Sequence, residues 1–146
     1  MITLNDIKDA KKRLDGTVYK TPLMKAPFLS IQKNAEIFFK EDNLQLTGSF
    51  KLRGAFNKVA MLDDEKKAAG VVAASAGNHA QGLAFAASYF KCEATIFMPE
   101  ATPLTKVLGV KSYGANVVLT GENFDEAYAS AIKFAKDNNK EFVHPF

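Results

Sequence analysis

The sequence has little of what disulfide-linked, metal-binding or membrane-spanning proteins require. A single cysteine, Cys92, excludes an intramolecular disulfide and offers no metal-ligand spacing. Only two histidines are present, which disfavours a zinc site. No apolar run approaches the roughly 20 residues that a membrane helix needs. Met1 is followed by no basic segment that leads into an apolar one, so the sequence predicts a cytoplasmic protein without a membrane partner.

Long runs of one charge are also missing. The 19 basic and 16 acidic residues give a formal net charge of +3 and are spread along all 146 residues. This distribution predicts no nucleic-acid partner. With 47% hydrophobic and 24% charged residues, the composition is that of a globular protein with one real core.

What the chain does have is one lysine at a predicted loop-to-helix junction, in the stretch Thr47 to Lys51 (Thr-Gly-Ser-Phe-Lys). Gly48 gives the loop access to positive φ, and Thr47 or Ser49 can cap the helix that follows. A helix beginning near Lys51 is predicted because apolar residues recur after it at i, i+3, i+4 and i+7. These residues are Leu52, Ala55, Phe56 and Val59.

The position of Lys51 favours a reactive amine. The positive end of the helix dipole disfavours a second positive charge, and the neighbouring Phe50 would help to exclude water. A neutral amine can form a Schiff base with a carbonyl or take a proton from carbon. Arg13 and Arg53 are the only arginines among 19 basic residues, which leaves 17 lysines, and most lysines are solvated. The local pattern alone therefore leaves a plain surface lysine as an alternative.

A second candidate site lies in Ser75 to Gly82 (Ser-Ala-Gly-Asn-His-Ala-Gln-Gly), which opens a predicted helix. Free amides at a helix start bind anions, and Gly77 would let a ligand approach closely. The same residues also fit a simple strand-to-helix turn in which Ser75 or Asn78 is the cap. A phosphate-binding P-loop is disfavoured, because no lysine follows the second glycine and no Gly-x-Gly-x-x-Gly occurs.

The remaining pattern predicts an α/β fold. A helix near residues 3–14 is capped by Thr3 or Asn5; an irregular but apolar stretch, 17–31, and a short strand, 37–39, follow. Short apolar runs predict strands covered on both faces at 70–74, 94–98, 115–119 and 141–143. Helices are predicted between them, at 78–90, 104–111 and 123–138.

This alternation predicts a three-layer sandwich with a mostly parallel sheet and right-handed crossovers. We expect the strand order 2-1-3-4, with Ser75 to His79 at a carboxyl end beside a switch point. The charged run Asp63 to Lys67 predicts the end of the Lys51 helix and a domain boundary, which gives domains 1–66 and 67–146.

Both candidate motifs resemble those of fold-type II pyridoxal-phosphate enzymes. Thr47 to Ala55 resembles the lysine motif found in threonine dehydratases and serine racemases, and Ser75 to Gly82 resembles their substrate-carboxylate loop. The similarity runs from about Tyr19 to Phe146, with one mild departure at Asp42, where relatives often carry a longer acid. The resemblance implies a tryptophan synthase beta-like fold.

The resemblance also implies roles for single residues. Lys51 corresponds to the lysine that holds pyridoxal 5'-phosphate as a Schiff base and moves protons at the substrate's α-carbon. Phe50 corresponds to the residue packed against the cofactor ring, and Asn78 to the one hydrogen-bonded to the cofactor's 3'-hydroxyl. Ser75 and the backbone amides of Ala76, Gly77, Asn78 and His79 correspond to the loop that holds the substrate carboxylate.

The reaction implied by the resemblance is the dehydration and deamination of L-threonine or L-serine. Loss of the α-proton is followed by expulsion of the β-hydroxyl, and the enamine hydrolyses to a 2-oxo acid, 2-oxobutanoate from threonine, and ammonia. Serine racemases of the family carry a serine at the position of Ala76, so elimination is expected here. The resemblance further implies a homo-oligomer and a place in amino-acid metabolism such as isoleucine biosynthesis.

One expected part is missing. The resemblance predicts a glycine-rich phosphate cup and a polar residue facing the pyridine nitrogen, and neither occurs before Phe146. The chain therefore resembles an N-terminal portion, with the opening part of the large domain in 1–66 and a nearly whole small domain in 67–146. We expect it to be inactive by itself. Three alternatives stay open: a catalytically silent module that self-associates, a serine racemase-like enzyme, and an unrelated flavodoxin-like binding domain.

Overall fold

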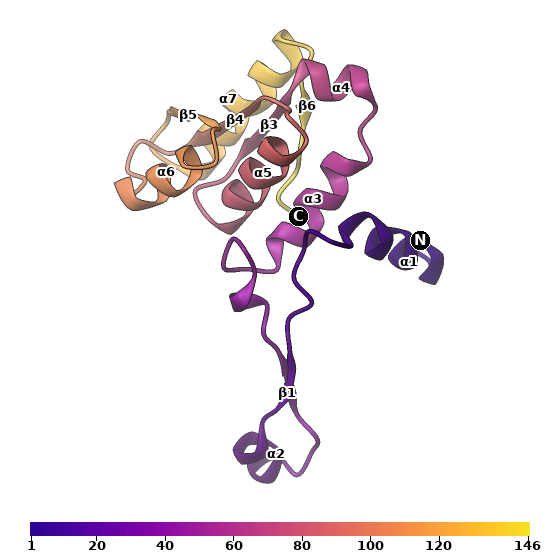
Figure 1. Ribbon diagram of the computed structural model, residues 1–146. Coiled ribbons are helices and arrows are strands. Elements are labelled where there is room, and N and C mark those ends of the chain that lie inside the picture. Colours follow the sequence, from indigo (N-terminus) through magenta and orange to yellow (C-terminus); the bar gives the residue numbers. More distant parts are fainter.

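The computed structural model describes residues 1–146 and centres on a four-stranded parallel sheet (Figure 1). Its strands are β3 (Val71–Ala74), β4 (Ala94–Met98), β5 (Asn116–Leu119) and β6 (Glu141–Phe142). Every side chain of β3 and β4 is buried, as the apolar runs predicted for strands covered on both faces. The same prediction is wrong for β5, an edge strand whose side chains are mostly exposed. The register places Val72 opposite both Thr95 and Phe142. The predicted parallel sheet is confirmed.

The predicted strand order 2-1-3-4 is wrong. The observed order is β5-β4-β3-β6, which numbers the four runs 3-2-1-4, so β5 pairs with β4 rather than with β3. Right-handed crossovers whose helices lie on the same face carry the chain in one direction, from β3 through β4 to β5. The next helix lies on the other face, so the chain returns to the far side of β3. The switch point is therefore beside β3, as expected, with Ser75 at its carboxyl end.

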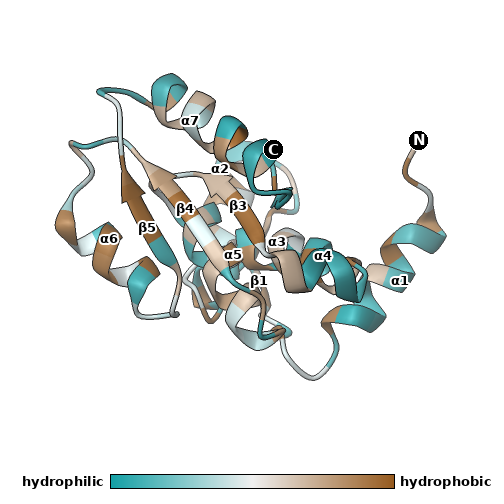
Figure 2. Ribbon diagram, turned by 90° about the horizontal axis from the view of Figure 1, so that it is seen from above, coloured by the Kyte–Doolittle hydropathy of each residue, from teal (hydrophilic) through white to brown (hydrophobic).

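Helices cover both faces of the sheet and make the predicted three layers (Figure 2). α3 (Lys51–Ala60), α5 (Asn78–Tyr89) and α6 (Leu104–Lys111) lie on one face, and α7 (Phe124–Asp137) lies on the other. Because side chains alternate along a strand, Val71 and Ala73 face the first group, whereas Val72 and Ala74 face α7. The three helices predicted between the strands are confirmed to within about one residue.

The Lys51 helix forms as its spacing predicted. Its buried residues are Leu52, Ala55, Phe56 and Val59, and they pack in one core with α5 and the sheet. Gly48 has a φ of 70°, so the expected positive φ is confirmed. The boundary residues after α3 form a short helix of their own, α4 (Asp64–Ala69), which the Asp63 side chain caps through the amide of Lys66. The division into domains 1–66 and 67–146 stays a prediction.

The N-terminal helix α1 (Leu4–Leu14) begins with the predicted cap. Thr3 accepts from the amide of Asp6, whose carboxylate in turn accepts from the Thr3 amide. α1 buries no residue and is joined to α3 by a hydrogen bond of 2.7 Å from Arg13 Nε to Asn57 Oδ1. None of the helices is long and apolar enough to cross a membrane.

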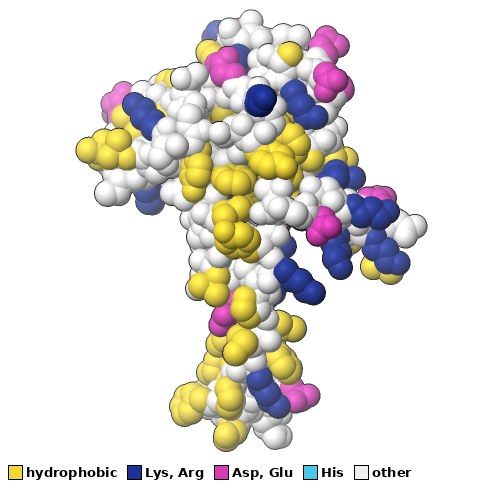
Figure 3. Space-filling model, in the orientation of Figure 1, with side chains coloured by type: hydrophobic (Ala, Val, Ile, Leu, Met, Phe, Trp, Pro, Cys, Tyr) yellow, Lys and Arg dark blue, Asp and Glu magenta, His cyan; other side chains and the backbone are white.

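An arm projects from the body between α1 and α3 (Figure 1). It consists of β1 (Leu23–Lys25) paired antiparallel with β2 (Phe38–Lys40), and of α2 (Pro27–Lys33) between them; the 3-10 turn Asp42–Leu44 follows. The stretch 17–31 is thus not wholly irregular as predicted, because Pro27 begins a helix at the position that proline favours. Exposed apolar side chains cover the arm in Figure 3: Leu23, Met24, Phe28, Ile31, Phe38 and Phe39.

Candidate active site

The loop after β3 presents backbone amides at the carboxyl edge of the sheet. Ser75 donates its amide to Phe97 O of the neighbouring β4, at 3.0 Å, and its Oγ accepts from the amide of Gly77, at 3.3 Å. Gly77 is the N-cap residue of α5, and the first amides of a helix have no intrahelical acceptor. A Cβ on Gly77 would meet nothing within 4 Å, so the loop faces open space. This edge can therefore receive an anion.

A hollow of about 440 Å³ brings the two sequence motifs together. Lys51 and the whole loop Ser75 to His79 line it, and we call it the Lys51 hollow. Its remaining lining residues are Lys106, Phe124, Pro145 and Phe146. A neighbouring hollow of about 450 Å³ shares Lys51, His79 and Phe146 and adds Phe50. Both volumes are in the range of small-molecule sites.

Lys51 is held by the end of the chain. Its Nζ donates to Pro145 O at 2.6 Å and lies 5.5 Å from the ring centroid of Phe50 and 5.6 Å from that of Phe146. The Pro145 carbonyl is 94 residues away in the sequence, so the pattern around Lys51 could not indicate this contact. The neutral amine expected from the sequence stays a prediction.

Of the two caps predicted for α3, the helix that begins at Lys51, only one forms. Ser49 Oγ accepts from the Lys51 amide at 3.3 Å, while the hydroxyl of Thr47 is buried without a partner. The N-cap residue itself is Phe50, whose side chain is largely exposed and makes no capping hydrogen bond. The helix start is thus fixed by packing more than by capping.

That packing depends on Gly82 of α5. A Cβ built on Gly82 would lie 3.2 Å from the carbonyl carbon of Lys51 and 3.2 Å from the amide nitrogen of Leu52. Real Cβ atoms rarely approach backbone so closely, so a glycine is what lets α5 contact the start of α3. Gly82, the last residue of the second motif, thus sets the position of the Lys51 backbone.

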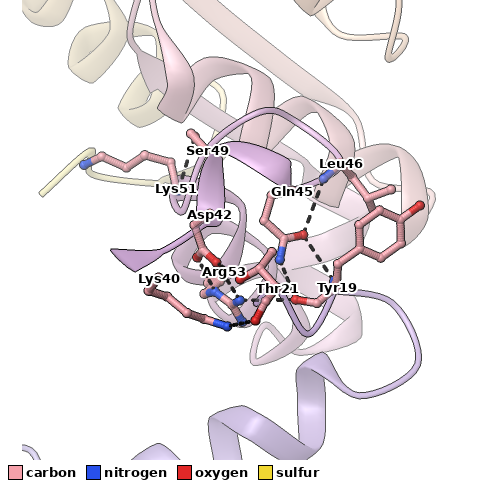
Figure 4. A network of polar contacts seen from close by, with 9 residues as sticks. All are labelled: Tyr19, Thr21, Lys40, Asp42, Gln45, Leu46, Ser49, Lys51 and Arg53. Carbon is pink, nitrogen blue, oxygen red and sulfur yellow. Dashed lines mark hydrogen bonds and ion pairs between the residues drawn. The ribbon is translucent and has the colours of Figure 1, made fainter. Parts of the chain in front are cut away.

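A polar network fastens the root of the arm to α3 (Figure 4). Arg53 donates to both carboxylate oxygens of Asp42, Nε at 2.6 Å and Nη2 at 2.9 Å, and Nη2 also reaches Tyr19 O at 3.2 Å. Thr21 donates a further hydrogen bond to Asp42. The hydrogen bond from Arg53 lowers the pKa of Asp42 to about 2. Arg53 belongs to the first turn of α3, so this network ties the start of the Lys51 helix to the root of the arm.

Acidification tests the Asp42 ion pair. A lowered folded-state pKa means that Asp42 stabilises the fold fully above its ordinary value of 3.8 and loses this effect as the pH falls toward about 2. Between pH 5 and pH 2 we expect the wild type to lose about 1–2 kcal/mol more unfolding free energy than Asp42→Asn, since solvent at the partly exposed Arg53 screens the pair. Urea unfolding at constant ionic strength measures the unfolding free energy at each pH. Equal losses in the wild type and in Asp42→Asn would contradict the prediction.

His79 has a different place from its loop neighbours. Its ring is buried, and Nε2 lies 3.1 Å from Val143 O. Burial lowers the pKa of His79, so the ring is neutral at pH 7 and donates to that carbonyl from Nε2. The side chain is thus committed to joining α5 to the end of the chain, and only the backbone amide of His79 can serve a ligand.

Sequence reasoning missed four residues of the Lys51 hollow: Lys106, Phe124, Pro145 and Phe146. They lie at or near the starts of α6 and α7 and after β6. In a parallel sheet, the carboxyl ends of all strands meet at one edge. The sequence signal that could have identified these four residues was their position after the predicted strands.

Comparison with known proteins fits this site. The family model described as "Pyridoxal-phosphate dependent enzyme" matches residues 14–146. The chain belongs to this family. L-threonine ammonia-lyase of Thermotoga maritima is 51% identical over all 146 residues, and L-threonine dehydratase biosynthetic IlvA of Lactococcus lactis is 48% identical over a 149-residue alignment that covers the whole chain. The chain spans 36% of the length of each of these relatives.

Solved structures agree on the fold. Serine racemase from Dictyostelium discoideum has a TM-score of 0.91 and 34% identity to this chain, with 99% of this chain and 47% of that one covered. The predicted fold class, that of the fold-type II pyridoxal-phosphate enzymes, is thereby confirmed.

The residues present fit one end of the family's cofactor. Lys51 offers an amine for its aldehyde carbon, Phe50 offers a ring face beside that amine, and the first-turn amides of α5 face the same hollow. Residues 1–146 do not supply the partners of the cofactor's phosphate group, because they contain no glycine-rich cup. The site thus fits the reactive end of the cofactor.

Proposed function

We propose that the chain is the N-terminal portion of a pyridoxal-phosphate-dependent L-threonine/L-serine dehydratase, which converts threonine to 2-oxobutanoate and ammonia. The observation that carries the proposal is the Lys51 hollow, which both the lysine and the Ser75 to His79 loop line. The threonine ammonia-lyase and dehydratase activities of the two relatives named above support it. A cytoplasmic location is part of the proposal, and the buried free thiol of Cys92 suits a reducing compartment.

Each residue has a definite task in this proposal. When bound, the cofactor supplies an electron sink for the negative charge that develops at the substrate's α-carbon. Lys51 binds the cofactor and takes the proton from that carbon. Ser75 and the amides from Ala76 to His79 hold the substrate carboxylate and so orient the breaking bond. Phe50 packs on the cofactor ring, and Asn78 donates to the cofactor's 3'-hydroxyl.

The proposal is tested with a fusion protein that has the full length of a relative. Residues 1–146 are joined to the C-terminal remainder of the Thermotoga maritima L-threonine ammonia-lyase, which supplies the parts missing here. With added cofactor, the fusion is expected to release 2-oxobutanoate from L-threonine, while the 146-residue chain is expected to release essentially none. A folded, cofactor-loaded fusion that leaves threonine and serine unchanged would refute the proposal.

Serine racemisation is the second candidate, because the serine racemase of Dictyostelium discoideum shares the fold at a TM-score of 0.91. Ala76 argues against it, since a methyl group has no proton to return to the opposite face of the α-carbon. We expect the fusion to form pyruvate from L-serine at least about tenfold faster than D-serine, and Ala76→Ser to raise the D-serine share. Chiral chromatography of the products decides this, and predominant D-serine from the unaltered fusion would contradict it.

A catalytically silent module is the remaining alternative, favoured by the exposed arm. Phe28 and Ile31 are 77% and 84% exposed on α2, and such apolar patches tend to be covered by association. We therefore expect the 15.9 kDa chain to form a dimer or larger species, consistent with a homo-oligomer at full length. Ile31→Lys should shift the chain toward monomer. Met61→Lys should not, because Met61, although 62% exposed, is the C-cap residue of α3 and lies outside the arm. Light scattering measures the mass, and a monomeric wild type would contradict the prediction.

A further inference from the structure

Lys106 is a second cation of the Lys51 hollow, and neither sequence motif includes it. It lies in the first turn of α6, which follows β4 as α5 follows β3, so both helices begin at the same edge of the sheet. It is exposed at the rim and lines the hollow together with Ser75, Gly77 and Asn78.

Close packing of α6 on α5 determines where Lys106 lies. A Cβ on Gly109 would lie 3.1 Å from Gln81 Nε2, so Gly109 is a point of close contact between the two helices. Lys106 is three residues before Gly109, and Asn78 is three residues before Gln81, so each lies on the contacting face of its helix. α5 and α6 run in the same direction on the same face of the sheet. Lys106 and Asn78 thus lie one turn before this contact in their helices, and both line the hollow.

The charge of Lys106 has no counterpart in the protein. No carboxylate lies within ion-pair distance of it, and none of the side chains that line the hollow is acidic. Glu126, two residues after the lining residue Phe124, accepts hydrogen bonds from the Glu122 amide at 2.9 Å and from Asn123 Nδ2 at 3.0 Å. A first helical turn also disfavours a cation. The position thus suits a cation that meets an anionic ligand.

We propose that Lys106 binds the carboxylate of the amino-acid substrate, together with the Ser75 loop. This assignment rests on the proposed function and extends it to α6. Lys51 cannot supply this charge, because its amine is committed to the cofactor and then to the α-carbon. Lys106 is the other lysine that lines the hollow, and the amides of Gly77 and Asn78 beside it supply the directional hydrogen bonds.

The test uses the 146-residue chain and needs no turnover. Amide chemical shifts are followed by ¹⁵N NMR while 2-oxobutanoate, a carboxylate of the substrate's size, is added; butanamide is the neutral control. We expect the wild type to bind 2-oxobutanoate with a millimolar Kd, with shifts at Ala76 to His79, and not to bind butanamide. Lys106→Gln should raise the Kd about fivefold or more, while Lys106→Arg stays near wild type. The matched control is Lys111→Gln, at the last turn of the same helix.

The outcomes separate this inference from the proposed function. An unchanged Kd in Lys106→Gln, no shift at the loop in the wild type, or an equal effect in Lys111→Gln would each overturn the role of Lys106. Lys106-dependent binding of the carboxylate would support it even where the fusion shows no dehydratase activity, a result that would overturn the dehydratase proposal alone.

Discussion

Replacing Lys51 with alanine is expected to reduce threonine turnover by the fusion about 10³-fold or more, because the residue serves both as the cofactor's amine and as the base at the α-carbon. The Lys51→Ala fusion should also lose the absorbance of the protein-linked cofactor. Reduction of the loaded fusion with borohydride, followed by peptide mapping, should place the label on the peptide that contains Lys51.

The control for this experiment is Lys133→Ala. Lys133 lies on α7, its side chain is 78% exposed, and it pairs with Asp137. It should keep the activity and the label of the unaltered fusion, since exposed pairs contribute little. A label on any other lysine, or near-normal turnover by Lys51→Ala, would contradict the assignment of Lys51 as the cofactor-binding lysine.

The second large effect is expected at Gly82. A valine there would force side-chain atoms into the backbone of Lys51 and Leu52, which the core on the other side holds in place. We expect Gly82→Val to lower the unfolding free energy by about 3 kcal/mol or more, and Gly82→Ala to lower it by about 1–2 kcal/mol despite alanine's higher helix propensity. In the fusion, Gly82→Ala should also impair cofactor binding, because α3 must move.

Gly54 provides a matched control within the partner helix. It lies in the middle of α3, and a Cβ there would meet nothing within 4 Å. Gly54→Ala should therefore raise the unfolding free energy by about 0.5–1 kcal/mol through helix propensity alone. Chemical denaturation of both alanine variants measures the contrast, and a stabilising Gly82→Ala would show that α5 does not press on the start of α3.

Local features of the fold could be predicted from sequence because their causes are local. The start of α3 at Lys51 and its buried face follow from four apolar residues at helical spacing. The buried strands β3 and β4 follow from short apolar runs, and the parallel sheet follows from their alternation with helices. The loop that contains Gly77 could be placed at the carboxyl end of β3, because the apolar run of the strand ends just before it and the predicted helix begins just after it.

The strand order and the surroundings of Lys51 were decided only by the tertiary structure. Periodicity identifies a strand but does not name its neighbour, so β5 could pair with β3 or β4 until the positions of α6 and α7 decided it. The same limit applies to the site: the contact of Lys51 with Pro145, the burial of His79 against Val143 and the approach of Lys106 all join residues distant in sequence. Each depends on which strand ends share an edge of the sheet, a property of the packed chain that no local pattern carries.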